Sequence, residues 1–112
     1  MKVINIAREF SPFPVGRFYD DGPDSGERFR DEHLEAPLKA GEAVKVELSG
    51  VEGYGSSFLD EAFGGIVRKL GLSKSEAEAK IILVADEDPV DQSYLTEIKS
   101  YIADACRNTA RK

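Results

Sequence analysis

The stretch VELSGVEGYGSSFLDEAFGGIVRKLG, residues 46–71, carries the clearest structural pattern in the sequence. It begins as a strand, because apolar and polar residues alternate from Val44 to Ser49. From Phe58 onward the apolar residues recur at spacings of three and four, which predicts an amphipathic helix. Gly71 is well placed to end that helix. The glycines and serines between the two patterns predict a loop that leads from the strand into the helix.

The segments on either side predict more strands and helices. Valine and isoleucine in residues 2–10 predict an opening strand, and the apolar run in residues 80–86 predicts a fully buried one. A helix is predicted over residues 25–39, with a kink or an end at Pro37. A final amphipathic helix is predicted over residues 91–110.

The loop after the first strand is rich in proline and glycine, and a short strand is predicted within it at residues 17–19. Alternation of strands and helices predicts an α/β fold with a mainly parallel or mixed sheet, of about four strands and about three helices. We expect residues 1–112 to form one domain of this kind.

Composition argues against several function classes. The chain has 112 residues with 15 Lys and Arg, 21 Asp and Glu, and a net charge of −6. This balance disfavours binding to nucleic acid or to an anionic membrane surface. No run of residues is long enough to span a bilayer, and the opening residues do not resemble a signal peptide. Cys106 has no second cysteine to pair with, which fits a reducing cytoplasm.

Known catalytic and cofactor motifs do not fit the glycine-serine loop. Gly53 and Gly55 match the start of a dinucleotide fingerprint, but Phe58 stands where the third glycine is required. A P-loop and a hydrolase nucleophile elbow also fail at this loop. His33 is the only histidine and lies on another predicted helix, where we expect it to be a surface or packing residue. We therefore expect no catalytic residues, no cofactor and no metal site, and we interpret the acidic residues 86–88 as a solvated loop.

A purely structural interpretation explains part of the loop. Ser57 stands three residues before Asp60, the spacing of a capping box, so Ser57 is predicted to be the helix N-cap. This leaves Ser56 unexplained, and also the paired glycines Gly64 and Gly65, which each cost a helix about 1 kcal/mol relative to alanine. Paired glycines inside a helix indicate that the sheet or a partner chain approaches the backbone closely.

The same stretch resembles the STAS domain of bacterial anti-sigma-factor antagonists. In those proteins a strand and a short loop lead into Asp-Ser-Ser-Gly at the start of a helix; the corresponding residues here are Gly55, Ser56, Ser57 and Phe58. Over nearly its full length the chain looks still more like the STAS-like family DUF4325. The resemblance lies in AREFSPFPVGRF (residues 7–18), DGPDSGERFR (residues 21–30) and GYGSSFLDEAFGGIVRKLG (residues 53–71).

The resemblance implies a regulatory switch. In STAS antagonists the first serine of the pair is phosphorylated by an anti-sigma kinase of the GHKL ATPase type; the unmodified form binds that kinase, and the phosphate releases it. Carried over, the modified residue would be Ser56, with Ser57 as a second candidate. We therefore expect a non-enzymatic bacterial module that binds a histidine-kinase-like ATPase or an anti-sigma protein.

The loop and the helix after it form the expected docking face. Its contact residues are expected near the exposed or half-exposed edge of the helix, and the candidates are Tyr54, Gly55, Phe58, Glu61, Gly65 and Arg68. Arg17 is a candidate for binding a phosphate or a carboxylate near the serines, or else an exposed arginine at a strand edge. The alternative function is a small-molecule, nucleotide or anion-binding module that uses the same loop. A homodimer through the paired glycines is equally compatible with the sequence.

Overall fold

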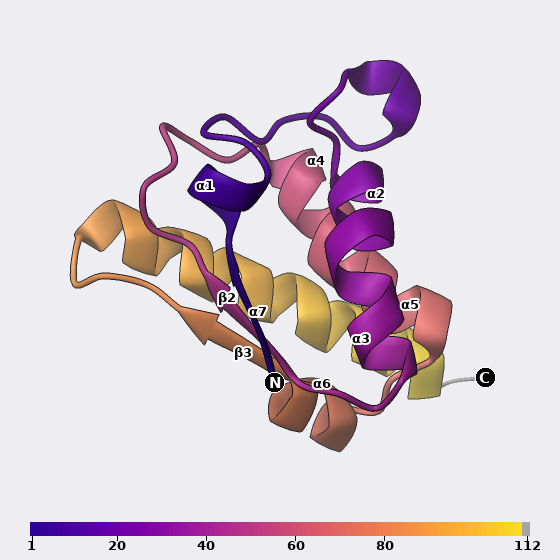
Figure 1. Ribbon diagram of the computed structural model, residues 1–112. Helices are drawn as coiled ribbons and strands as arrows, with labels where there is room; N and C mark the ends of the chain where they lie inside the picture. Colours follow the sequence, from indigo (N-terminus) through magenta and orange to yellow (C-terminus); the bar gives the residue numbers. More distant parts are fainter. Residues whose placement is uncertain (111–112) are drawn as a thin grey trace.

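Three parallel strands form the sheet of this protein, which a computed structural model describes over residues 1–110. The strands are β1 (Lys2–Asn5), β2 (Val44–Glu47) and β3 (Ile81–Val84), and β2 lies between the other two (Figure 1). Lys2 pairs with Val44, which pairs with Ile81, so the strands begin at the same level. The loops that follow β2 and β3 therefore start at the same end of the sheet.

Helices fill most of the chain between and after the strands. A short α1 (Ile6–Glu9) follows β1 directly, and a 3-10 turn, η1, occupies Tyr19–Asp21. Residues 26–39 form one continuous helix composed of α2 (Gly26–Phe29), η2 (Arg30–Leu34) and α3 (Glu35–Lys39). Residues 56–70 form a second, composed of α4 (Ser56–Leu59), η3 (Asp60–Gly64) and α5 (Gly65–Leu70). The last two helices are α6 (Lys74–Lys80) and α7 (Pro89–Ala110).

Both composite helices contain a π-helical segment, η2 in the first and η3 in the second. In η2 the hydrogen bond from the Glu35 N–H reaches the Arg30 carbonyl, one residue further than in an α-helix. The first helix continues through Pro37 to Lys39, so the predicted end at Pro37 is wrong. The π segment just before Pro37 is the irregularity that this helix carries instead.

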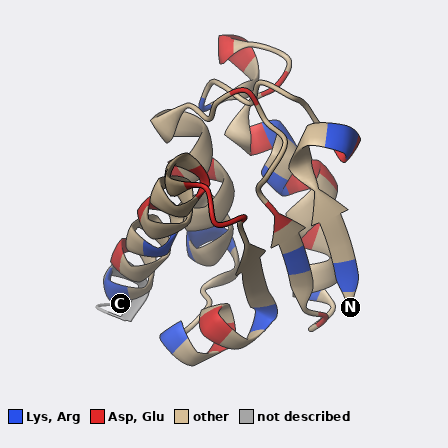
Figure 2. Cartoon of the chain, turned by 90° about the vertical axis from the view of Figure 1, so that its left-hand side faces the viewer, with Lys and Arg blue, Asp and Glu red and all other residues tan. Residues whose placement is uncertain are grey.

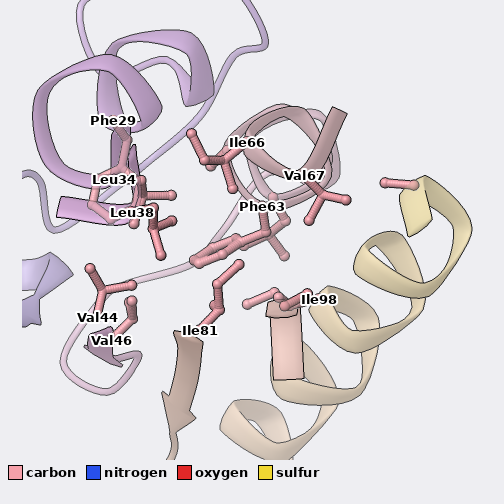
Figure 3. Packing of buried hydrophobic residues seen from close by; sticks show 14 of the residues in the cluster. Phe29, Leu34, Leu38, Val44, Val46, Phe63, Ile66, Val67, Ile81 and Ile98 are labelled. Atoms are coloured by element: carbon pink, nitrogen blue, oxygen red, sulfur yellow. The ribbon is translucent and has the colours of Figure 1, made fainter. Parts of the chain in front are cut away.

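The hydrophobic core lies against one face of the sheet. Ile4, Val46 and Ile81 lie on this face and are at most 5% exposed. The helices supply the other half of the core, as Figure 3 shows for Phe29, Leu34, Leu38, Phe63, Ile66, Val67 and Ile98. The opposite face is more open, because Val3 is 49% exposed and Val84 is 36% exposed.

The second composite helix lies between two others. Its η3 segment contacts α2 and α7, and its α4 segment also contacts α2 (Figure 1). The surroundings of the paired glycines are crowded mainly by charged side chains. A Cβ atom on Gly64 would lie 2.9 Å from Oδ1 of Asp60 and 3.0 Å from Nη1 of Arg68, both on the same helix. A Cβ atom on Gly65 would lie 3.1 Å from Oε2 of Glu61 on the same helix and 3.2 Å from Nη1 of Arg30 in η2. The close approach is therefore made by ion-paired side chains of the same chain, and the prediction that the sheet or a partner chain makes it is wrong.

Several predictions about the fold are confirmed and several are wrong. The α/β class and the end of the second composite helix at Gly71, in a left-handed conformation with φ of 64°, are confirmed. The described residues hold three strands and more helices than predicted, and residues 17–19 form no strand. β3 is an edge strand rather than a fully buried one, since only Ile81 in it is buried.

α6 was missed by the sequence reasoning, although Ser73 and Glu76 form a capping box at its start. The helix is hard to recognise because Ala77 is its only buried residue, so it lacks an apolar stripe. Within residues 1–110 there is no helix with both the length and the apolar character needed to cross a membrane.

Candidate functional site

The serine pair lies at the start of the second composite helix, and both serines are exposed. The first helical hydrogen bond runs from the Leu59 N–H to the Gly55 carbonyl, at 3.1 Å. The backbone N–H groups of residues 56–58 therefore precede the helical ladder and point out of its positive end. Gly55 is held from the other side, because its N–H donates to the Pro14 carbonyl at 3.0 Å.

Ser57 is not the N-cap, so that prediction is wrong. The helix begins two residues earlier, with Gly55 at the N-cap position and no side-chain capping bond. Elsewhere the chain does use side-chain caps, for example Ser25 at the start of α2. With no capping role, the hydroxyl groups of Ser56 and Ser57 stay available at the surface.

Ser56 lies beside a tyrosine on α7 that sequence reasoning did not identify. The Tyr101 hydroxyl donates to Oε2 of Glu97 at 2.6 Å. This hydrogen bond is the largest cause that raises the pKa of Tyr101 above its ordinary value, and burial is the next. A hydrogen bond with Ser56 lowers the same pKa. The Glu97 carboxylate therefore lies within one side chain of the Ser56 hydroxyl and sets a negative potential on this flank.

Arg17 links the preceding loop to the helix. Its Nη1 lies 2.8 Å from Oδ2 of Asp60 and 3.5 Å from Oε1 of Glu61. The hydrogen bond with Asp60 is the largest cause that raises the Arg17 pKa above its ordinary value. Asp60 also meets Arg68, whose Nη1 is 3.6 Å from Oδ1. The candidate anion-binding arginine is therefore already paired with carboxylates of its own chain.

Arg17 and the serines share one surface hollow. Its walls come from two segments that are distant in sequence: Gly16, Arg17, Phe18 and Asp21 on one side, and Gly55, Ser56 and Ser57 on the other. The hollow opens to solvent, so a hydroxyl in it can be reached by a large partner or by a modifying enzyme.

Exposed apolar side chains lie on the loop that forms one wall of the hollow, and the sequence reasoning did not select them. Phe13 and Phe18 are each 48% exposed. Val15 packs against Gly55, where an added Cβ atom would lie 3.4 Å from Cα of Val15. We call Phe13, Val15, Phe18, Ser56 and Ser57 together the serine face. The signal in the sequence was the presence of large apolar residues in a loop rich in proline and glycine, where a core role was not available.

The helix after the serines presents much less surface than predicted. The expectation that Phe58, Glu61 and Gly65 lie near an exposed edge is wrong, because all three are buried. Phe58 packs among aromatic rings, with its centroid 5.9 Å from that of Phe10. Arg68 alone of these four candidates is exposed.

Tyr54 is a partly buried anchor of the loop. Its hydroxyl donates to the Leu48 carbonyl at 2.7 Å, and its ring packs against Tyr94 at 4.9 Å between centroids. Burial is the largest cause that raises the pKa of Tyr54 above its ordinary value. This anchor fixes the turn that leads from β2 to Gly55.

Glu61 takes part in a buried ion pair between the two composite helices. Its Oε2 contacts Nη1 of Arg30, and both side chains are almost fully covered. The predicted docking residue Glu61 therefore stabilises the packing of the helices under the site.

His33 and the acidic loop agree with their structural interpretations. His33 is half-buried and stacks on Phe29 at 5.3 Å between ring centroids. Figure 2 shows acidic residues in the loop between β3 and α7, and Asp86, Glu87 and Asp88 are all exposed there. Over the described part of the chain, no group of three or more His, Cys, Asp or Glu side chains is arranged to hold a metal ion.

The comparisons with known proteins identify a family without a known activity. No curated protein and no solved structure matches the chain. A family model described as a STAS-like domain of unknown function (DUF4325) matches residues 25–91, which include the serine pair and both composite helices. Since this match covers more than half of the sequence, the chain belongs to the STAS-like family DUF4325.

Proposed function

We propose that this chain is a non-enzymatic regulatory module that binds a protein partner through the serine face. The observation that carries the proposal is the exposure of Ser56 and Ser57 in a hollow that the exposed Phe18 also lines, with Phe13 exposed on the same loop as Phe18. Exposed aromatic residues around a small polar centre are typical of protein-binding surfaces.

The partner that we propose is a histidine-kinase-like ATPase of the GHKL type or an anti-sigma protein. The family's likeness to STAS domains supports this choice, because STAS antagonists bind such proteins next to the corresponding serine. The partner surface would place apolar groups against Phe13 and Phe18. It would also place neutral groups near the acids Asp60 and Glu97, since like charges across an interface are unfavourable and an added negative charge would then have no partner.

Phosphorylation of Ser56 is the proposed switch. A phosphate adds a charge of about −1.5 to −2 at pH 7. The N–H groups at the start of the helix can donate hydrogen bonds to the phosphate oxygens, so the fold tolerates the added charge. Glu97, which reaches Ser56 through Tyr101, adds negative charge at the same place. A partner adapted to the unmodified surface would then meet an excess of negative charge and dissociate.

The test is a binding measurement with a purified GHKL-type ATPase from the same organism. Phe18→Ser should weaken binding at least about tenfold, as expected for an aromatic contact residue. Val90→Ser is the matched control, because Val90 is another exposed apolar residue but lies at the start of α7 outside the serine face. Equal binding of wild type and Phe18→Ser would contradict the proposed face.

The switch has its own control. Ser56→Glu should weaken binding at least about tenfold, whereas Ser56→Gln, which has the same size and no charge, should stay within about threefold of wild type. Equal effects of Glu and Gln would attribute the loss to size and would remove the electrostatic switch. Equal binding of both variants and wild type would remove Ser56 from the interface.

A second candidate, anion or nucleotide binding in the hollow, has one observation in its favour. Free N–H groups of residues 56–58 and the guanidinium of Arg17 border the same space. A nucleotide present at 100 times its Kd would add about 2.7 kcal/mol to the stability of the folded state. A thermal shift with nucleotides or inorganic phosphate that disappears in Arg17→Ala would favour this candidate.

A further inference from the structure

Arg17 shares both of its carboxylate partners with other arginines. Its Nη1 lies 2.8 Å from Oδ2 of Asp60 and 3.5 Å from Oε1 of Glu61. Asp60 also meets Arg68, whose Nη1 is 3.6 Å from Oδ1, and Glu61 meets Arg30 in the ion pair between the composite helices. Neither acid therefore loses its last cation when the guanidinium of Arg17 turns away.

The burial of these groups determines which ion pair is the more easily replaced. The side chains of Arg30 and Glu61 are only 12% and 11% exposed, so their separation would leave charges with little access to water. The side chains of Arg17 and Asp60 are 33% and 26% exposed, and an ion pair with more access to water contributes less. An added anion would therefore displace Asp60 from Arg17 before it disturbed the buried pair.

Ser56 lies one helical turn from the replaceable pair. The Asp60 N–H donates to the Ser56 carbonyl, so these two side chains are neighbours on one face of the helix, with Cβ atoms about 5–6 Å apart. Ser56 and Arg17 also line the same hollow. A phosphate on the Ser56 hydroxyl would therefore lie beside the guanidinium that Asp60 now holds.

The backbone of Arg17 is fixed independently of its side chain. The Arg17 N–H donates to Oδ2 of Asp21 at 3.2 Å, and the Arg17 carbonyl accepts from the Glu27 N–H at 3.0 Å. Only the guanidinium and its flexible stem would have to turn toward the phosphate. Among the described residues that line the hollow, Arg17 is also the only cation.

We propose that a phosphate on Ser56 takes the place of Asp60 on Arg17, so that Arg17 fixes the modified serine against the wall of the hollow. This inference rests on the proposed phosphorylation of Ser56. A phosphate carries about −1.5 to −2 charge at pH 7, more than a carboxylate, and a guanidinium can bind two of its oxygens at once. Asp60 keeps its contact with Arg68 after the exchange.

The test is a phosphorus NMR titration of the full chain with phosphoserine installed at position 56 as the chain is synthesised. An unperturbed phosphoserine has its second pKa at about 6. Acids near the phosphate, which include Asp60, Asp21 and Glu97, raise this pKa, whereas Arg17 lowers it. Arg17→Gln should therefore raise the phosphate pKa by at least about half a unit. Arg17→Lys, which keeps the charge but not the two-point contact, should raise it less.

Arg8→Gln is the matched control for the loss of one arginine. Arg8 is 78% exposed and pairs with Glu47 at the end of β2, outside the serine face. This variant should leave the phosphate pKa unchanged, and circular dichroism checks that each variant is folded. Equal phosphate pKa values in wild type and Arg17→Gln would overturn the proposal. So would a shift of the same size in Arg8→Gln, because a general effect of net charge would then explain both.

A second measurement leaves Arg17 in place. The Nε–H resonance of Arg17, assigned by its absence in Arg17→Lys, should shift with the same midpoint as the phosphorus resonance in the phosphorylated chain. In the unmodified chain it should stay constant over about pH 5 to 7, the range in which the phosphate titrates. A resonance that does not respond to the phosphate would overturn the proposal.

These results are separate from those that test the serine face. The phosphate is installed without a kinase, and no partner is present in either titration. Loss of the partner proposal would leave a shifted phosphate pKa unexplained by anything except the exchange on Arg17. Failure of the exchange would leave the binding measurements with Phe18→Ser and Ser56→Glu unaffected.

Discussion

Gly26→Ala is the substitution whose effect the structure defines most sharply. Gly26 opens α2 and is buried against the start of the second composite helix. A Cβ atom built there would lie 2.5 Å from the Phe58 carbonyl oxygen, 2.9 Å from Cβ of Glu61 and 3.1 Å from the Ala62 nitrogen. The first and last of these are backbone atoms, so a side-chain rotation cannot relieve the overlap.

The expected size of the effect follows from two opposing contributions. Alanine stabilises a helix by up to about 1 kcal/mol relative to glycine. To restore an ordinary contact of 3.4 Å from the 2.5 Å overlap, the two helices must separate by 0.9 Å, the difference between these distances. Strain of this kind costs about 1–3 kcal/mol and occasionally more. The unfavourable contribution is larger, and we expect a net loss of about 2 kcal/mol.

Urea unfolding measures this loss. With an m-value of about 2 kcal/mol/M, the midpoint should fall by about 1 M at unchanged m. Gly53→Ala is the matched control, because the nearest atom to its new Cβ is the Tyr94 hydroxyl oxygen at 3.7 Å. We expect the control to lie within about 0.5 kcal/mol of wild type. A Gly26→Ala protein as stable as the control would refute the close packing of α2 on α4.

Three further predictions concern polar groups. Glu61→Ala should lower the free energy of unfolding by about 3 kcal/mol, because it leaves Arg30 as a buried charge with its strongest partner removed. Tyr54→Phe should cost about 1 kcal/mol in thermal or urea unfolding, because the Leu48 carbonyl loses its donor. Burial lowers the pKa of His33, so the imidazole binds a proton more readily in the unfolded state than in the folded state. The stability that depends on His33 should therefore fall as the pH drops below the ordinary pKa of histidine.

Each of these predictions has a comparison that could contradict it. For Glu61, the reference is Glu35→Ala, which breaks the more exposed pair with Lys69 on the same two helices and should cost less. For Tyr54, an unchanged midpoint would mean that water replaces the lost donor. For His33, the reference is His33→Gln; the difference in stability between the two proteins should shrink in acid, and a difference independent of pH would contradict the burial of a neutral imidazole.

The sequence predicted those parts of the fold that depend on local patterns. Alternation identified β2, the spacing of apolar residues identified the helix after Phe58, and Gly71 ended it as expected. The π segments at 30–34 and 60–64 left no comparable signal, since they depend on how two helices fit against each other. For the same reason the pair of Arg30 and Glu61, separated by 31 residues, was not predicted.

The sequence predicted where the candidate site lies but not all of the residues that form it. The exposed serines at a helix start were expected from the glycine-serine loop and are found there. The expected docking face placed Phe58 and Gly65 near an exposed or half-exposed edge, but α2 and α7 cover this helix from two directions. Phe18 comes from a loop about forty residues earlier, and only the tertiary fold brings it to Ser56.

The loop that carries Phe13 and Phe18 is fixed by backbone bonds as well as by charge. The Glu52, Gly55, Gly26 and Glu27 N–H groups donate to the carbonyls of Pro12, Pro14, Gly16 and Arg17, at distances of 2.7 to 3.0 Å. The ion pair of Arg17 with Asp60 is one further attachment. A phosphate on Ser56 can compete only with Asp60 for the guanidinium of Arg17. The backbone bonds join uncharged N–H and C=O groups, so the added charge does not compete with them.

This division determines how the proposed switch would work. If a phosphate draws Arg17 away from Asp60, the carbonyl and N–H bonds still hold the loop, so Phe13 and Phe18 keep their positions. The partner would then meet an unchanged apolar surface with an altered charge at its centre. Release would come from electrostatic repulsion and loss of fit at Ser56, and the phosphorylated chain should unfold with nearly the same midpoint as the unmodified one. A large change in stability on phosphorylation would instead indicate that the loop itself rearranges.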